Sequence, residues 1–215
     1  MNTKRMLLIN VVLLVLLVGG GFFGYYYYNQ SVNYISTDNA QVAGQQVKIS
    51  APANGVLTEW NGNIGDVFKK GDTIGVIQSI GENGRVDIPV TAPDNGTIVQ
   101  SNAVENSFLA AGTPLAISYD LNNLWITANI EETSINEVKV GQEVDIKVDA
   151  YPNLEISGNV EQIGLATAGT FSLLPNNNTS GNYTKQTQVI PVKISLENHV
   201  EKLVPGMNAT VRIHK

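Results

Sequence analysis

The residues that could perform chemistry are few, and their spacing matches no known catalytic arrangement. The chain of 215 residues has no cysteine and two histidines, His199 and His214. The lack of cysteine excludes disulfides, thiolate metal sites and a thiol nucleophile. No Ser-His-Asp set or carboxylate pair stands at a recognised spacing, and both histidines lie in polar surroundings typical of the surface. We therefore assign no catalytic, cofactor-binding or metal-binding residue and expect no enzyme.

The carboxylates also favour structural roles. Asp38, Asp66, Asp72 and Asp94 each lie beside a predicted turn, where a carboxylate commonly accepts hydrogen bonds from nearby backbone amides. The chain has 19 acidic against 13 basic residues, a net charge of −6. A nucleic-acid-binding protein of this size normally carries a basic face, so we expect no nucleic-acid partner.

The N-terminal segment is typical of a membrane anchor. Residues 6–28 contain no charged side chain. As a helix they would be about 34 Å long, and a hydrocarbon core is about 30 Å thick. Lys4 and Arg5 precede the segment, which places the N-terminus in the cytoplasm and the rest outside by the positive-inside rule. A cleavable signal peptide is the alternative, but Phe22 and Phe23, followed by four tyrosines, fit a bilayer interface better than a cleavage site.

Two glycines in this segment are candidates for contact with another helix. Gly20 and Gly24 form a small-xxx-small pair, the spacing that lets two membrane helices approach closely. Glycine is also simply common in membrane spans, and this second interpretation stays open.

The rest of the chain alternates between apolar and polar residues with a period of two. This pattern predicts half-buried β-strands and is clear at 86–90, 124–130, 144–148, 190–196 and 209–213. Gly-rich turns separate these segments. Many short strands of this kind indicate small barrels or sandwiches, so the predicted fold class is mainly β. The only helical candidate beyond the anchor is short, at about 131–138.

An internal repeat relates two parts of the chain. Residues 49–57 match residues 90–98 at an offset of 41, and both copies contain Ala-Pro-x-Asn-Gly. The same offset carries Gly71 onto Gly112. We expect two pseudo-symmetric halves, each of which completes the other.

These motifs resemble a known family. Residues 47–55 (V-K-I-S-A-P-A-N-G) with 65–74 (G-D-V-F-K-K-G-D-T-I) resemble a biotinyl/lipoyl-like domain. Residues 37–42 resemble the start of HlyD/EmrA-type membrane fusion proteins (periplasmic adaptor proteins), while 121–126 and 205–207 resemble parts of their β-barrel. The resemblance implies an anchor over 1–28, a linker with the first strand over 29–45, a lipoyl-like β-sandwich over 46–118, and a β-barrel over 119–215.

One departure from the family pattern is informative. Family members usually insert a long α-helical hairpin between the lipoyl halves, and here residues 78–85 (Q-S-I-G-E-N-G-R) predict a short hairpin turn. The chain could not reach an outer-membrane duct in the family's way. A single-membrane, Gram-positive-type bacterium is the economical reading, and a specialised short adaptor in a two-membrane cell stays open. The tip also lacks the lysine that a biotin or lipoate carrier needs, and Lys69 and Lys70 lie beside another turn.

A long loop supplies the remaining candidate contacts. Residues 166–186 carry one charge, Lys185, and loops of this length are commonly functional or disordered. Phe171, Leu173 and Leu174 could dock against a partner or a second copy of the chain. They could equally cover the end of the barrel.

The resemblance implies an adaptor subunit of an export or multidrug efflux pump. It implies a transporter partner in the plasma membrane, a major-facilitator drug/proton antiporter in preference to an ABC exporter. Contact with lipid through the N-terminal helix, several adaptor copies and no cofactor are also expected. The alternative is an extracellular module that binds cell-wall polymer or a small ligand without a transporter. Its mark would be an aromatic-lined cleft, and the ectodomain aromatics are scattered.

Overall fold

The structure is a computed structural model that describes residues 3–81, 84–171, 187–197 and 203–215. It does not describe the side chains of residues 3–10, 27, 29–31 and 171. The chain divides into two compact units, one of residues 1–40, 127–197 and 208–215, the other of residues 41–126 and 198–207. The predicted boundaries at 45/46 and 118/119 stay predictions.

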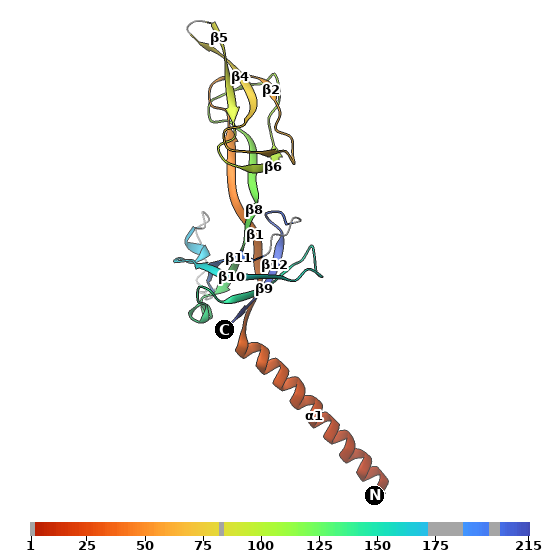
Figure 1. Cartoon of the computed structure of the whole chain (residues 1–215). Coiled ribbons are helices and arrows are strands. Elements are labelled where there is room, and N and C mark those ends of the chain that lie inside the picture. Colours follow the sequence, from red (N-terminus) through yellow and green to blue (C-terminus); the bar gives the residue numbers. More distant parts are fainter. Residues whose placement is uncertain (1–2, 82–83, 172–186, 198–202) are drawn as a thin grey trace, which may run out of the picture. The chain divides into compact units, whose positions relative to one another are not determined.

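The chain begins with one long helix, α1 (Thr3–Asn33), drawn in red in Figure 1. All residues from 11 to 26 are exposed, including the valines, leucines and phenylalanines. Among the residues that the structure describes, no helix combines the length and the apolar character needed to cross a membrane. Strand β1 (Tyr34–Ser50) follows α1 without a linker.

The unit of residues 41–126 and 198–207 is a β-sandwich. One sheet has the strand order β5-β4-β2-β7, and the facing layer has β8-β6-β3 together with β1. The strands are β2 (Gly55–Trp60), β3 (Val67–Phe68), β4 (Thr73–Gly81), β5 (Gly84–Thr91), β6 (Gly96–Ser101), β7 (Phe108–Leu109) and β8 (Pro114–Glu131). Ten buried apolar side chains form its core, and Leu57, Ile74 and Ile77 among them are fully buried from solvent.

The backbone hydrogen bonds of the sandwich repeat at the offset of 41 and confirm the predicted pseudo-symmetry. In the first matched pair, Gly71 N–H donates to Ala92 O and Gly112 N–H donates to Ala51 O, both at 2.8 Å. In the second, Asn61 N–H donates to Ile74 O and Asn102 N–H donates to Leu115 O, both at 2.7 Å. In the third, Ile98 N–H donates to Asp66 O (2.9 Å) and Leu57 N–H donates to Ser107 O (3.0 Å). The second pair repeats inside each half, while the first and third pairs show that each half donates to and accepts from the other at equivalent positions.

The repeated asparagines explain why the Asn-Gly turns are duplicated. The Asn54 side-chain oxygen accepts from the Ala111 amide (2.8 Å), and that of Asn95 accepts from the Lys70 amide (2.9 Å). Each turn thus satisfies a backbone donor of the opposite half, which a loop would otherwise leave unpaired.

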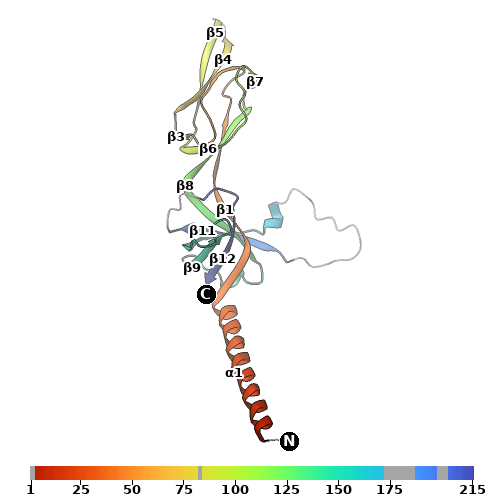
Figure 2. The same cartoon turned by 90° about the vertical axis from the view of Figure 1, so that its right-hand side faces the viewer.

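The unit of residues 1–40, 127–197 and 208–215 contains a closed β-barrel. Its strands pair in the ring β1-β12-β9-β10-β11-β8, which the β1–β8 pairing closes. The remaining strands are β9 (Glu143–Val148), β10 (Ile156–Ile163), β11 (Val189–Leu196) and β12 (Asn208–His214). Figure 2 labels β9, β11 and β12 of this barrel; β9 pairs with β12, and β10 lies between β9 and β11. Closure leaves no open sheet edge between the described strands of the barrel.

The barrel core follows the predicted alternation. Val144, Ile146 and Val148 of β9 are buried, and the residues between them are exposed. The helix expected at about 131–138 is a single 3₁₀ turn, η1 (Ile135–Glu137). Its preceding residues continue β8 to Glu131 because Ile130 packs inside the barrel. The mainly β fold class, with a sandwich of two pseudo-symmetric halves and a barrel, is confirmed.

Candidate docking surfaces

The glycines predicted to contact another helix lie on an open face of α1. Gly20 and Gly24 are one turn apart, and a Cβ atom at either position would meet no other atom within 4 Å. Their face of α1 therefore has room for a second helix to approach. Their role in partner contact stays a prediction.

The connection between the sandwich halves is a short β-hairpin. Strands β4 and β5 pair up to Gly81 and Gly84, and the two tip residues, 82 and 83, lie outside the described residues. The hairpin extends beyond the sandwich core, where the side chain of Ile80 is 88% exposed. Lys69 and Lys70 are exposed beside the Gly71 turn, away from this hairpin in the sequence, as predicted.

The long loop after β10 is described only at its start. Leu165 is fully exposed, and a short 3₁₀ helix, η2 (Ala168–Phe171), follows it. The Phe171 side chain is not described, and Leu173 and Leu174 lie outside the described residues. Their predicted docking role stays a prediction.

Three of the four carboxylates predicted beside turns accept a hydrogen bond from a nearby backbone amide, whereas Asp38 lies within strand β1 and not beside a turn. Asp66 and Asp72 accept from the amides of Asn63 (2.8 Å) and Lys69 (2.9 Å), three residues earlier. Asp94 accepts from the adjacent Asn95 amide at 2.9 Å. In the described part of the chain, no group of three His, Asp or Glu side chains could hold a metal ion.

An apolar groove on the sandwich unit was not predicted. It has a volume of about 680 Å³ and is lined by Ile64, Val99, Tyr119, Leu121, Val204 and Pro205, among others. Ile64 is 70% exposed there. Ile64 lies in the turn Asn61-Gly62-Asn63-Ile64-Gly65, outside any alternating pattern that would bury it. This isolated apolar residue in a polar turn was the sequence signal that could have indicated an exposed apolar surface.

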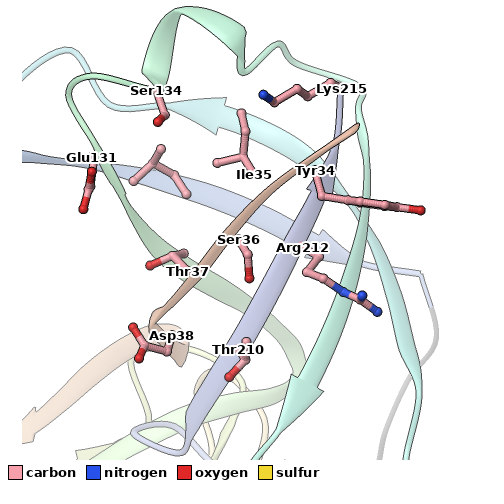
Figure 3. A pocket seen from close by; sticks show the side chains of 11 residues that line it. Tyr34, Ile35, Ser36, Thr37, Asp38, Glu131, Ser134, Thr210, Arg212 and Lys215 are labelled. Carbon is pink, nitrogen blue, oxygen red and sulfur yellow. The ribbon is translucent and has the colours of Figure 1, made fainter. Parts of the chain in front are cut away.

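A polar depression on the barrel unit was also missed. It measures about 800 Å³, and its lining includes Tyr34, Asp38, Glu131, Thr210, Arg212 and Lys215. Figure 3 shows the two carboxylates on one side of this polar depression and the two basic residues on the other. The residues come from β1, β8, β12 and the C-terminus, so only strand pairing brings them together.

The basic side of the polar depression is organised around Tyr34. The Arg212 guanidinium carbon lies 5.6 Å from the Tyr34 ring centroid, and the His214 ring meets the Tyr34 ring edge to face at 4.8 Å. Asp145 lies 3.1 Å from His214 Nε2 and 3.8 Å from Arg212. His214 is therefore partnered, whereas the sequence had suggested a lone surface histidine. His199 lies outside the described residues.

Two domain families match the chain in the order that the fold shows. Residues 45–120 match the YhbJ barrel-sandwich hybrid domain, and residues 124–213 match the YknX-like β-barrel domain. A sandwich hybrid followed by a small barrel is the architecture predicted from the resemblance to adaptor proteins.

The chain is similar over nearly its whole length to YhbJ of Bacillus subtilis, whose name describes it as a putative efflux system component. The two are 46% identical over 213 residues, which cover 99% of this chain and 94% of YhbJ. The colistin resistance protein EmrA of Acinetobacter baumannii is 35% identical over 126 residues, 58% of this chain and 36% of EmrA. A solved structure of the periplasmic adaptor protein EmrA superimposes with a TM-score of 0.56 at 13% identity, covering 86% of this chain and 99% of that structure.

The chain belongs to the membrane fusion (adaptor) protein family of efflux systems, in the branch that contains YhbJ and EmrA. The predicted family and efflux-adaptor function are thereby confirmed at this level. The chain spans about a third of the length of the EmrA-type relatives that it matches.

Proposed function

We propose that this protein is the membrane-anchored adaptor subunit of a drug-export pump in a bacterium with a single membrane. The β4–β5 connection carries this proposal. In an adaptor fold, a hairpin whose strands pair up to Gly81 and Gly84 leaves no segment long enough to reach a second membrane. An adaptor of this form acts at the outer face of the membrane that holds its transporter.

The anchor is the uncharged segment of α1. Residues 6–28 form part of one continuous helix, and Lys4 and Arg5 precede them. This arrangement supports a single-pass topology with the N-terminus in the cytoplasm and both β units outside. The apolar side chains at 11–18, 22 and 23 are exposed, which supports contact with lipid or with a partner helix.

The partner is a transporter in the same membrane, with a major-facilitator antiporter preferred over an ABC exporter because the EmrA-type resemblance points that way. The transporter supplies the energy, and the adaptor performs no catalytic step. Several adaptor copies surround the exit path. Gly20 and Gly24 contact the transporter helix, and the loop bearing Phe171, Leu173 and Leu174 contacts a neighbouring subunit.

The rival function, an extracellular binding module, has weaker support. Stacking on glycans needs several aromatic side chains in one cleft. The apolar groove has Tyr119 as its one aromatic lining residue, and the polar depression has Tyr34.

Purification of the tagged full-length protein from its own membranes in mild detergent tests the proposal. We expect a polytopic transporter to co-purify in stoichiometric amount, identified by mass spectrometry. A double variant, Gly20→Leu with Gly24→Leu, should reduce that yield about tenfold because the bulky side chains prevent close helix approach. Gly19→Leu is the matched control, since a Cβ there also meets nothing within 4 Å, and at about 100° per residue Gly19 lies about 120° around the helix from the midpoint of Gly20 and Gly24.

Two outcomes would contradict the proposal. Recovery of the protein alone, or with cell-wall fragments, would favour the binding module. Equal transporter yields from the double variant and the Gly19→Leu control would leave the adaptor function standing but reject the assigned helix contact.

A further inference from the structure

The acidic side of the polar depression has charge that the protein itself does not neutralise. Asp38 on β1 and Glu131 at the end of β8 form no ion pair with any residue that the structure describes. Both are exposed and line the same depression (Figure 3). Two carboxylates that line one depression without a basic partner favour a cationic ligand group at this side.

The basic side offers a complementary donor. Arg212 is separated from its nearest carboxylate, Asp145, by 3.8 Å, which exceeds the 2.7–2.9 Å of a charge-assisted hydrogen bond. Its guanidinium instead stacks near the Tyr34 ring at 5.6 Å, which holds the group in place. Lys215 is engaged by Glu137 at 2.5 Å. Arg212 is therefore the principal group for an anion, and a guanidinium suits a phosphate.

The two sides are separated by hydroxyl-bearing and apolar residues of the same depression. Ser36, Thr210 and Ser134 line it together with Ile35 and Ile130. A ligand that spans the depression must therefore carry a positive group and a negative group on a short linker. Asp38 and Glu131 on one side and Arg212 on the other are therefore complementary to a ligand that carries both signs of charge.

The place of these residues in the chain indicates the source of such a ligand. Five helical residues, 29–33, separate the end of the uncharged segment from Tyr34, a rise of about 7.5 Å. The headgroup layer outside a hydrocarbon core is about 5–7 Å thick on each side. With the uncharged segment in the hydrocarbon core, as proposed above, residues 34–38 of β1 begin at about the outer limit of the headgroups.

We propose that the polar depression binds the zwitterionic headgroup of an aminophospholipid, with its phosphodiester at Arg212 and its primary ammonium at Asp38 and Glu131. The ammonium has three N–H donors, which carboxylates accept. A trimethylammonium headgroup lacks these donors and binds less well. The inference rests on the proposed membrane anchoring, and it adds a lipid-dependent orientation of the barrel at the membrane surface.

Hydrogen exchange of the full-length protein in nanodiscs tests this. One set of nanodiscs holds phosphatidylglycerol alone, the second adds phosphatidylethanolamine, and the third adds phosphatidylcholine. We expect phosphatidylethanolamine to slow amide exchange at residues 34–38 and 208–215 by about threefold or more, as a weak surface ion pair would. The phosphatidylcholine effect should be smaller.

Single substitutions locate the effect. Asp38→Asn and Arg212→Gln should each abolish the phosphatidylethanolamine dependence. Asp149→Asn and Lys139→Gln are the matched controls, because they make the same charge changes at exposed positions of the barrel unit outside the polar depression and should retain the dependence.

Several results would overturn the inference. One is an equal rate of amide exchange with and without phosphatidylethanolamine. A second is equal slowing of exchange by phosphatidylcholine, and a third is that the control variants lose the phosphatidylethanolamine dependence as fully as Asp38→Asn and Arg212→Gln. Protection by soluble glycerophosphoethanolamine but not by the lipid would also reject a membrane ligand. A chain that fails to co-migrate with nanodiscs would refute the anchor itself, so failure of the proposed function is distinguishable.

Discussion

Replacing Gly55 with alanine should destabilise the sandwich more than the same replacement at Gly96, although the two glycines are equivalent in the repeat. Both follow the asparagine of an Ala-Pro-x-Asn-Gly turn, and both are buried at the start of a strand. Neither has a positive φ, so alanine is compatible with the backbone at each position and only the available space differs.

The space is smaller at Gly55. A Cβ atom there would lie 2.4 Å from the Gln78 carbonyl oxygen and 2.7 Å from Ile77 Cγ2. At Gly96 the nearest atom, the Tyr119 carbonyl oxygen, is 3.0 Å away. Overpacking typically costs about 1–3 kcal/mol, and Gly→Ala returns about 0.4–1 kcal/mol by restricting the unfolded chain. We expect a net loss of about 2 kcal/mol at Gly55 and about 0–1 kcal/mol at Gly96.

Thermal unfolding of the full-length protein in detergent, followed by circular dichroism, measures the loss of stability in the Gly55→Ala and Gly96→Ala variants. A loss of about 2 kcal/mol lowers Tm by about 4–8 °C for a chain of this size. Gly55→Ala should show that shift and Gly96→Ala about half of it or less. Gly19→Ala, where a Cβ meets nothing within 4 Å, is the control for the substitution itself. Equal shifts at Gly55 and Gly96, or a larger one at Gly96, would refute the steric argument.

Two further substitutions test the packing of each unit. Trp60→Phe should lower the free energy of unfolding, measured in urea, by about 1–2 kcal/mol. The indole N–H donates to Gly62 O (2.9 Å) and Ser101 Oγ (3.0 Å), and phenylalanine leaves both acceptors without this donor. A variant as stable as the wild type would show that water replaces that donor. Ile146→Ala should cost about 2–5 kcal/mol, since Ile146 is 2% exposed inside the barrel, whereas the exposed neighbour in Lys147→Ala should change stability by less than about 0.5 kcal/mol. Similar losses at both positions would contradict the inward and outward alternation of β9.

Much of the fold was predictable because its determinants are local or repeated. Alternation along β9 identifies the inward residues, and the offset of 41 between the two Ala-Pro-x-Asn-Gly turns already implies that the halves share one set of hydrogen bonds. The short 78–85 connection was equally evident, because eight residues rich in Gly and Asn can only turn back.

The docking surfaces were not predictable in the same way. The sequence by itself determined the family, the β class, the pseudo-symmetry and the uncharged N-terminal segment, since each depends on composition or on spacing along the chain. Only the tertiary structure decided that Asp38, Glu131 and Arg212 line one depression, because that depends on which strands pair in the barrel and in which register. The same holds for His214 and Asp145, 69 positions apart, whose contact follows from the pairing of β12 with β9. Pairing between distant strands is set by the packing of the whole core, and no local sequence signal encodes it.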